Sequence, residues 1–124
     1  MKAGDVFRLV KGADKHAKVI ISDPASFPGK VLFVGMTSWD PREDQSCILL
    51  PGDHSTVYHR TCITYSRGNA KASNTELDAM FRAGLLQVFE PVSNDVLQRI
   101  RKGAIESTRT PKDFKEMLVR QGLA

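Results

Sequence analysis

The pattern of the sequence changes once, near residue 72, and this change constrains the fold more than any other feature. Before it, short runs rich in β-branched and other apolar residues alternate with turns containing glycine and proline. After it, apolar residues recur at helical spacing. A chain of 124 residues is long enough for one domain and short for two. We therefore predict a single, mainly β domain of the α+β class (1–124), with a β-barrel core (1–72) and a C-terminal helical part packed on it (73–124).

The first part of the chain predicts a small antiparallel barrel. Its five short runs are separated by turn signals, an arrangement typical of a strongly bent sheet or barrel. The third run, KVLFVGMT, is apolar without interruption, which predicts burial on both faces. A loop is predicted over 66–74, after the last run. The five predicted strands span 5–10, 16–22, 30–37, 46–50 and 56–65.

The second part predicts three helices and one more strand. In the last helix, Thr110 is the predicted N-cap, Pro111 the first helical residue and Gly122 the end. Ser93 or Asn94 is expected to cap the helix before it. The predicted helices span 75–84, 93–107 and 110–122, and the sixth strand spans 85–91. We expect their basic residues to form a solvated face, namely Arg99, Arg101, Lys102 and Arg109.

The overall charge and the cysteines narrow the class of protein. A net charge of +4 permits a polyanionic partner such as RNA without demanding one. No apolar run approaches the ~20 residues that cross a bilayer, and the first residues lack a signal-peptide pattern, so we expect a cytoplasmic protein with no membrane contact. Cys47 and Cys62 are predicted to be buried thiols, because a zinc site needs more ligands at closer spacing. We expect neither a metal nor a cofactor.

Polar residues at the end of the third strand form the first candidate site. Thr37 and Ser38 supply hydroxyls that donate to a phosphate, and Trp39 is a ring on which a base stacks. The alternative is a plain turn, in which the hydroxyls close the chain and Trp39 anchors the core.

The three histidines are the candidates for acid–base chemistry, because imidazole titrates near neutrality. His16 opens the second strand. His54 follows Asp53 in a tight turn, where the carboxylate orients the ring or bonds to its own backbone. His59 is expected mid-strand, on the face of Val57 and Ile63, as an ordinary core or surface histidine.

The order of these features resembles the MazF/PemK family of bacterial toxins. The resemblance rests on GDVF at the first strand, MTS at the end of the third and a PGDH turn, and it covers roughly residues 4–67. It implies an SH3-like barrel and a toxin of a toxin–antitoxin pair. It also implies a homodimer that cleaves single-stranded RNA sequence-selectively and without a metal, and that has an antitoxin protein as partner. A phage- and plasmid-associated group with a GDH turn is similar.

In that family, an arginine early in the second strand and a threonine after the third carry the chemistry. Thr37 or Ser38 matches the threonine, whereas this chain has KHAK at the arginine's place, so that His16 or Lys18 stands in. The predicted catalytic residues are His16, Thr37 and His54, and the predicted RNA-binding residues are Lys18, Ser38 and Trp39. The alternatives are a non-catalytic SH3-like module that binds protein or RNA, and a former toxin that serves a mobile element as a binding protein.

Overall fold

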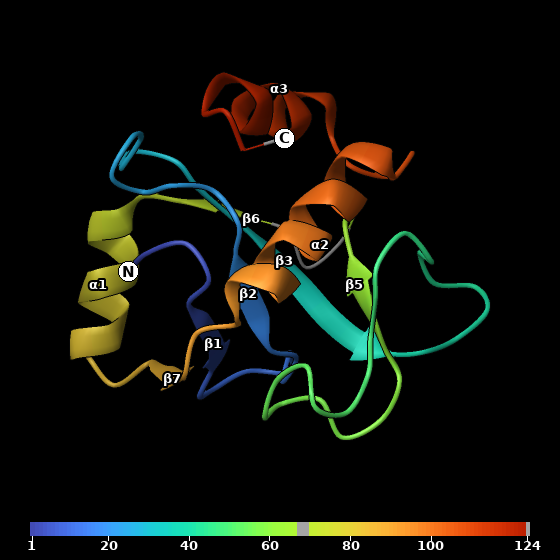
Figure 1. Ribbon diagram of the computed structural model, residues 1–124. Helices are drawn as coiled ribbons and strands as arrows, with labels where there is room; N and C mark the ends of the chain where they lie inside the picture. Colours follow the sequence, from blue (N-terminus) through green and yellow to red (C-terminus); the bar gives the residue numbers. More distant parts are fainter. Residues whose placement is uncertain (67–69, 124) are drawn as a thin grey trace.

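The computed structural model describes residues 1–66 and 70–123 and shows an α+β fold built on one antiparallel sheet (Figure 1). Six strands follow the spatial order β4-β5-β3-β2-β1-β7. β6 pairs with the first part of β3 (31–33), and β5 pairs with the last part (35–38). Within the described residues, all helices come after residue 72, as predicted. The strands are β1 (Val6–Leu9), β2 (Lys18–Ile20), β3 (Val31–Ser38), β4 (Ile48–Leu49), β5 (Thr61–Thr64), β6 (Ala70–Ala72) and β7 (Leu86–Phe89), and the helices are α1 (Asn74–Arg82), α2 (Asn94–Glu106) and α3 (Lys112–Arg120).

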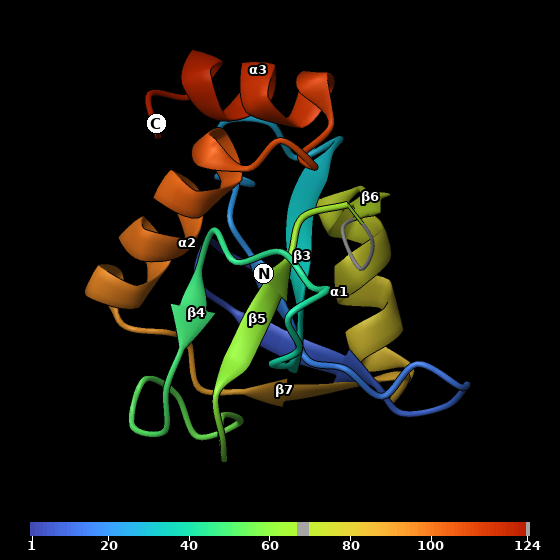
Figure 2. The same ribbon diagram turned by 90° about the vertical axis from the view of Figure 1, so that its right-hand side faces the viewer.

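The sheet lies between two layers of helix, which explains why β3 is apolar throughout. α2 crosses one face of the sheet with α3 beside it, and α1 covers the other face (Figures 1 and 2). Because side chains alternate along a strand, Leu32 and Val34 pack toward α2 while Val31 and Phe33 pack toward α1. Two apolar cores result, one on each face, and β3 is buried from Val31 to Met36.

The predicted barrel does not close. The sheet begins at β4 and ends at β7, and these two strands do not pair within the described ranges. β4 has only two residues and β7 pairs with β1, so the two ends lack a ladder that would join them. The architecture is therefore an open, helix-covered antiparallel sheet.

Several predicted boundaries were wrong. The fifth strand covers only Thr61–Thr64, because residues 56–60 form a loop. The predicted loop 66–74 contains β6, while its residues 67–69 lie outside the described part. Thr110 is not the N-cap of α3. Pro111 holds that position with an extended ψ of 142°, and its carbonyl accepts hydrogen bonds from Phe114 and Lys115.

The predicted cap of α2 is confirmed, but the predicted solvated face of basic residues is wrong for Arg101. Ser93 caps α2 as predicted, because its side chain accepts a hydrogen bond from the amide of Val96. Arg101 is not part of a solvated face. It is buried, and its Nε donates to the carbonyl of Ile21 at 2.8 Å, which ties α2 to the strand region beneath it.

Candidate functional site

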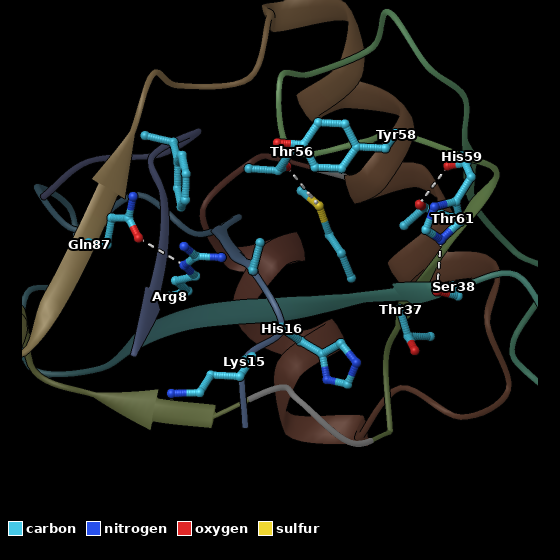
Figure 3. A pocket seen from close by; sticks show the side chains of 13 residues that line it. Arg8, Lys15, His16, Thr37, Ser38, Thr56, Tyr58, His59, Thr61 and Gln87 are labelled. Atoms are coloured by element: carbon cyan, nitrogen blue, oxygen red, sulfur yellow. Dashed lines mark hydrogen bonds between the residues drawn. The ribbon is translucent and has the colours of Figure 1, made fainter. Parts of the chain in front are cut away.

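An open pocket of about 340 Å³ lies where β1, β3 and β7 meet two loops (Figure 3). Arg8 of β1 and Gln87 of β7 form one wall. The C-terminal end of β3 and the loop 56–60 form the opposite wall. The remaining wall comes from Lys15 and His16, which precede β2. The polar lining therefore contains two imidazoles, two cations and several hydroxyls, from Arg8, Lys15, His16, Thr37, Ser38, Tyr58, His59 and Thr61.

His59 is fixed at the rim of this pocket by the end of β3. Its Nε2 lies 2.7 Å from the Oγ of Ser38, and its carbonyl accepts a hydrogen bond from Thr61 Oγ1 at 2.9 Å. The expectation that His59 shares a strand face with Val57 and Ile63 was wrong. It precedes β5 and is exposed, whereas Val57 and Ile63 are buried.

His16 also lines the pocket and is held by Asp14. The backbone amide of His16 donates to Asp14 Oδ1 at 3.0 Å, and its ring Nδ1 lies 3.2 Å from the same oxygen. Asp14 is a carboxylate at neutral pH, because the hydrogen bond from Lys18 and that from the His16 amide lower its pKa to about 2. An anionic acceptor beside Nδ1 favours a proton on that nitrogen.

Lys18 lies outside this pocket. Its Nζ is 2.8 Å from Asp14 Oδ2, and the residue is 7% exposed. It lines a smaller hollow together with His16 and Thr37. Lys18 therefore positions the Asp14 carboxylate, which in turn holds His16. The charge of Lys18 is already paired with that carboxylate.

Arg8 supplies a cation that sequence reasoning did not select. Its Nε donates to Gln87 Oε1 at 2.9 Å, and its guanidinium lies 5.5 Å from the centre of the Phe89 ring. These contacts orient the group on the exposed side of β1. The family's second-strand arginine is absent from this sequence, yet the fold places an arginine from the neighbouring strand in the pocket.

His54 is not brought to this pocket. It is 7% exposed, and its Nε2 lies 2.7 Å from the carbonyl oxygen of Glu90. Its Nδ1 accepts a hydrogen bond from the amide of Thr56 at 3.2 Å, so Nε2 carries the proton and donates to Glu90. Nε2 thus ties the 54–56 turn to the chain after β7, while Nδ1 closes the turn on Thr56.

Trp39 occupies the adjoining hollow, which shares Thr37 and Ser38 with the pocket. The guanidinium of Arg60 lies 3.8 Å from the centre of the indole ring, and Trp39 Nε1 donates to Gln45 at 2.8 Å. Trp39 is therefore oriented at the surface, 36% exposed, and is absent from both apolar cores. This position removes the alternative in which it anchors the core.

Sequence reasoning thus found His16, Thr37 and Ser38 in the pocket and Trp39 beside it, and missed Arg8, Lys15, Tyr58 and the role of His59. Two features of the sequence could have indicated these residues. Arg8 is a charged residue within an otherwise apolar strand, and Tyr58-His59-Arg60 places an aromatic ring, an imidazole and a guanidinium in succession.

The described residues contain neither a metal-ligand cluster nor a membrane-spanning helix. No three His, Cys, Asp or Glu side chains of the described chain lie close enough together to hold a metal ion. Within residues 1–66 and 70–123, no helix is long and apolar enough to cross a bilayer. Comparisons with protein-family models, with curated proteins and with solved structures find no match for this chain.

Proposed function

We propose that this chain is a toxin-like, metal-independent endoribonuclease that acts on single-stranded RNA at the pocket of His16 and His59. One observation carries the proposal: a single open pocket gathers two imidazoles, the cations of Arg8 and Lys15, and the hydroxyls of Thr37 and Ser38 (Figure 3). RNA cleavage without a metal needs these groups, namely an acid, a base and donors for a charged phosphorane.

The reaction is an internal transfer at phosphorus. One imidazole removes the proton of the ribose 2′-hydroxyl, and the 2′-oxygen forms a bond to phosphorus. The bond from phosphorus to the 5′-oxygen breaks, and the other imidazole gives that oxygen a proton. The products are a 2′,3′-cyclic phosphate and a 5′-hydroxyl, so each turnover moves one proton onto the base and one off the acid.

The contacts of the two rings suit them to different parts in this reaction. Nδ1 of His16 lies 3.2 Å from the Asp14 carboxylate, and we assign this carboxylate-paired ring as the general acid. His59 shares its Nε2 with the Ser38 hydroxyl, and we assign it as the general base. Arg8 and Lys15 hold the phosphate, and Thr37 donates to its developing charge.

The remaining expectations from the MazF/PemK resemblance stay proposals. They are a divergent, open version of the SH3-like fold, a homodimer, an antitoxin protein as partner, and a cytoplasmic location. The proposed site differs from the earlier expectation in three respects. Arg8 takes the place of the missing arginine, Lys15 takes that of Lys18 at the phosphate, and His59 takes that of His54.

The open sheet favours a second candidate, a non-catalytic module that binds a protein strand or RNA. β7 ends the sheet order and pairs with β1 among the described strands, so its outer edge is able to accept another strand. In this case the pocket binds phosphate without cleaving RNA.

Incubation of the protein with a mixed single-stranded RNA, with and without a chelator, tests the proposal. The wild type should yield 2′,3′-cyclic phosphate ends at the same rate in the chelator, whereas His16→Ala and His59→Ala should be impaired. Absence of cleavage at every pH, with RNA binding retained, would favour the binding module instead.

A further inference from the structure

Tyr58 is the most unusual side chain at the pocket, because it is large and almost fully solvated. It is 83% exposed, whereas the other exposed large hydrophobic residues range from 36 to 58% across the described chain. It nevertheless lines the pocket, immediately before His59. An aromatic ring held at the mouth of a cationic pocket has the character of a surface on which a ligand's own ring stacks.

The backbone around Tyr58 is anchored, although the ring itself is solvated. His59 bonds to Ser38, and the carbonyl of Arg60 accepts a hydrogen bond from the amide of Trp39 at 2.9 Å. Both residues that follow Tyr58 are therefore tied to the end of β3. This anchoring reduces the entropy that a ligand must overcome when it stacks on the ring.

A second ring lies in the adjoining hollow. Trp39 lines the hollow of about 520 Å³ that shares Thr37 and Ser38 with the pocket. Arg60 covers one face of the indole ring, and Gln45 accepts a hydrogen bond from its Nε1. Each of the two hollows is thus lined by one aromatic residue, and the hollows share Thr37 and Ser38, the latter bonded to the imidazole assigned to the chemistry.

From this arrangement we infer that the site binds two consecutive nucleotides, with one base stacked on Tyr58, the next against Trp39, and their shared phosphate in the pocket. This inference rests on the proposed function and deepens it by naming a dinucleotide step as the bound unit. Every base has a flat face, so the rings contribute affinity with little sequence selectivity. The cations contribute the part of the affinity that salt weakens.

Binding of a 2′-O-methyl hexanucleotide tests the inference, because this probe lacks the 2′-hydroxyl and is not cleaved. Tyr58→Ala and Trp39→Ala should each bind it about 5- to 150-fold more weakly than the wild type, the range expected for one stacked base. Tyr58→Phe is the matched control and should bind within about twofold, because it keeps the ring. A hexanucleotide with abasic sites at all positions keeps the phosphates, and Tyr58→Ala should bind it as the wild type does.

The outcomes separate this inference from the proposed catalysis. Wild-type affinity of Tyr58→Ala for the intact probe would overturn the stacking inference, and RNA cleavage by the same variant would leave the catalytic proposal standing. Weaker binding by Tyr58→Ala in a protein that cleaves no RNA would support the inference and remove the catalysis. Failure of the wild type to bind the probe at low salt would overturn both.

Discussion

The Nε2 atom of His59 and the Oγ atom of Ser38 lie 2.7 Å apart, at a point where the backbone of Ser38 pairs with Thr61 in the ladder between β3 and β5. The imidazole is therefore oriented by a hydroxyl that is itself fixed by the sheet. This contact turns two residues 21 positions apart into one unit of the proposed site.

Replacing His59 should abolish most of the proposed activity without affecting the fold. His59→Ala should lower RNA cleavage by roughly 10²–10⁴-fold, the usual contribution of one general acid or base. Its thermal unfolding should stay near that of the wild type, since the side chain is exposed. Initial rates on a defined single-stranded RNA measure the effect.

His59→Gln is the matched control, because glutamine keeps a hydrogen-bonding group near Ser38 and cannot exchange a proton. It should be as inactive as His59→Ala. Ser38→Ala should lose less than His59→Ala, because it keeps the imidazole and removes only the hydroxyl that orients the ring and donates in the pocket. The pH–rate profile of Ser38→Ala should change shape. A wild-type rate in His59→Gln would remove His59 from the chemistry.

His54 should matter for stability. A turn residue usually supports little packing, but this ring is buried and bridges Thr56 to the carbonyl of Glu90. His54→Ala leaves these partners unsatisfied and opens a cavity, so we expect a loss of about 2–4 kcal/mol in the free energy of unfolding. Urea denaturation measures the loss, and the folded fraction should retain RNA cleavage. A midpoint equal to that of the wild type would contradict the structural role.

Gly103 permits the close approach of α2 to the sheet. A Cβ on residue 103 would clash with the hydroxyl of Tyr65 and lie 2.9 Å from the Cβ of Cys47, both in the core. Alanine normally stabilises a helix by about 1 kcal/mol relative to glycine, but here overpacking should reverse the sign and cost about 1–3 kcal/mol. Lys102→Ala, at the exposed neighbouring position, is the control and should change stability little. A stabilised Gly103→Ala would show that the helix moves away easily.

Alkaline pH should lower the stability of the fold through Cys47 and Tyr65, the two residues that pack against Gly103. Burial raises the pKa of the Cys47 thiol from 9.0 to about 11, and burial also raises the pKa of Tyr65. The folded state thus holds these protons above the pH at which the unfolded chain releases them. The stability that they provide is present below about pH 9 and lost as the pH rises toward 11, by on the order of 2 kcal/mol for Cys47.

Urea midpoints from pH 8 to 11 measure this decline. Cys47→Ala should show a shallower slope than the wild type, because the unfolded variant has no thiol to ionise at position 47. Equal slopes would mean that other groups control the alkaline transition.

Local patterns predicted most of the fold. The apolar runs located β1, β2, β3 and β7, and caps such as Ser93 located the helices, because these signals act within a few residues. Closure of the sheet depends on pairing between β4 and β7, which are far apart in the sequence. That pairing leaves no local pattern, and the expected barrel was therefore wrong.

The site was predicted less well, because it depends on contacts across the sheet. Thr37 and Ser38 were visible as hydroxyls that end an apolar strand. His59 looked like a strand residue, since the alternation in 56–65 extends past the true start of β5. Arg8 is oriented in the pocket by Gln87, which lies opposite it because β7 pairs beside β1, a long-range pairing that the sequence does not show.

The end of the pairing between β3 and β5 makes the site able to open locally without unfolding of the whole protein. Ser38 and Trp39 hold the loop 56–60 through the pairing of Ser38 with Thr61 and one hydrogen bond from the amide of Trp39 to the carbonyl of Arg60. Strand ends fray more readily than strand centres. Each fraying event would separate His59 from Ser38 and Arg60 from the indole together, while both apolar cores stay intact. The fraction of molecules with an assembled site is then set by a local opening equilibrium, which amide hydrogen exchange at Trp39 reports independently of global unfolding.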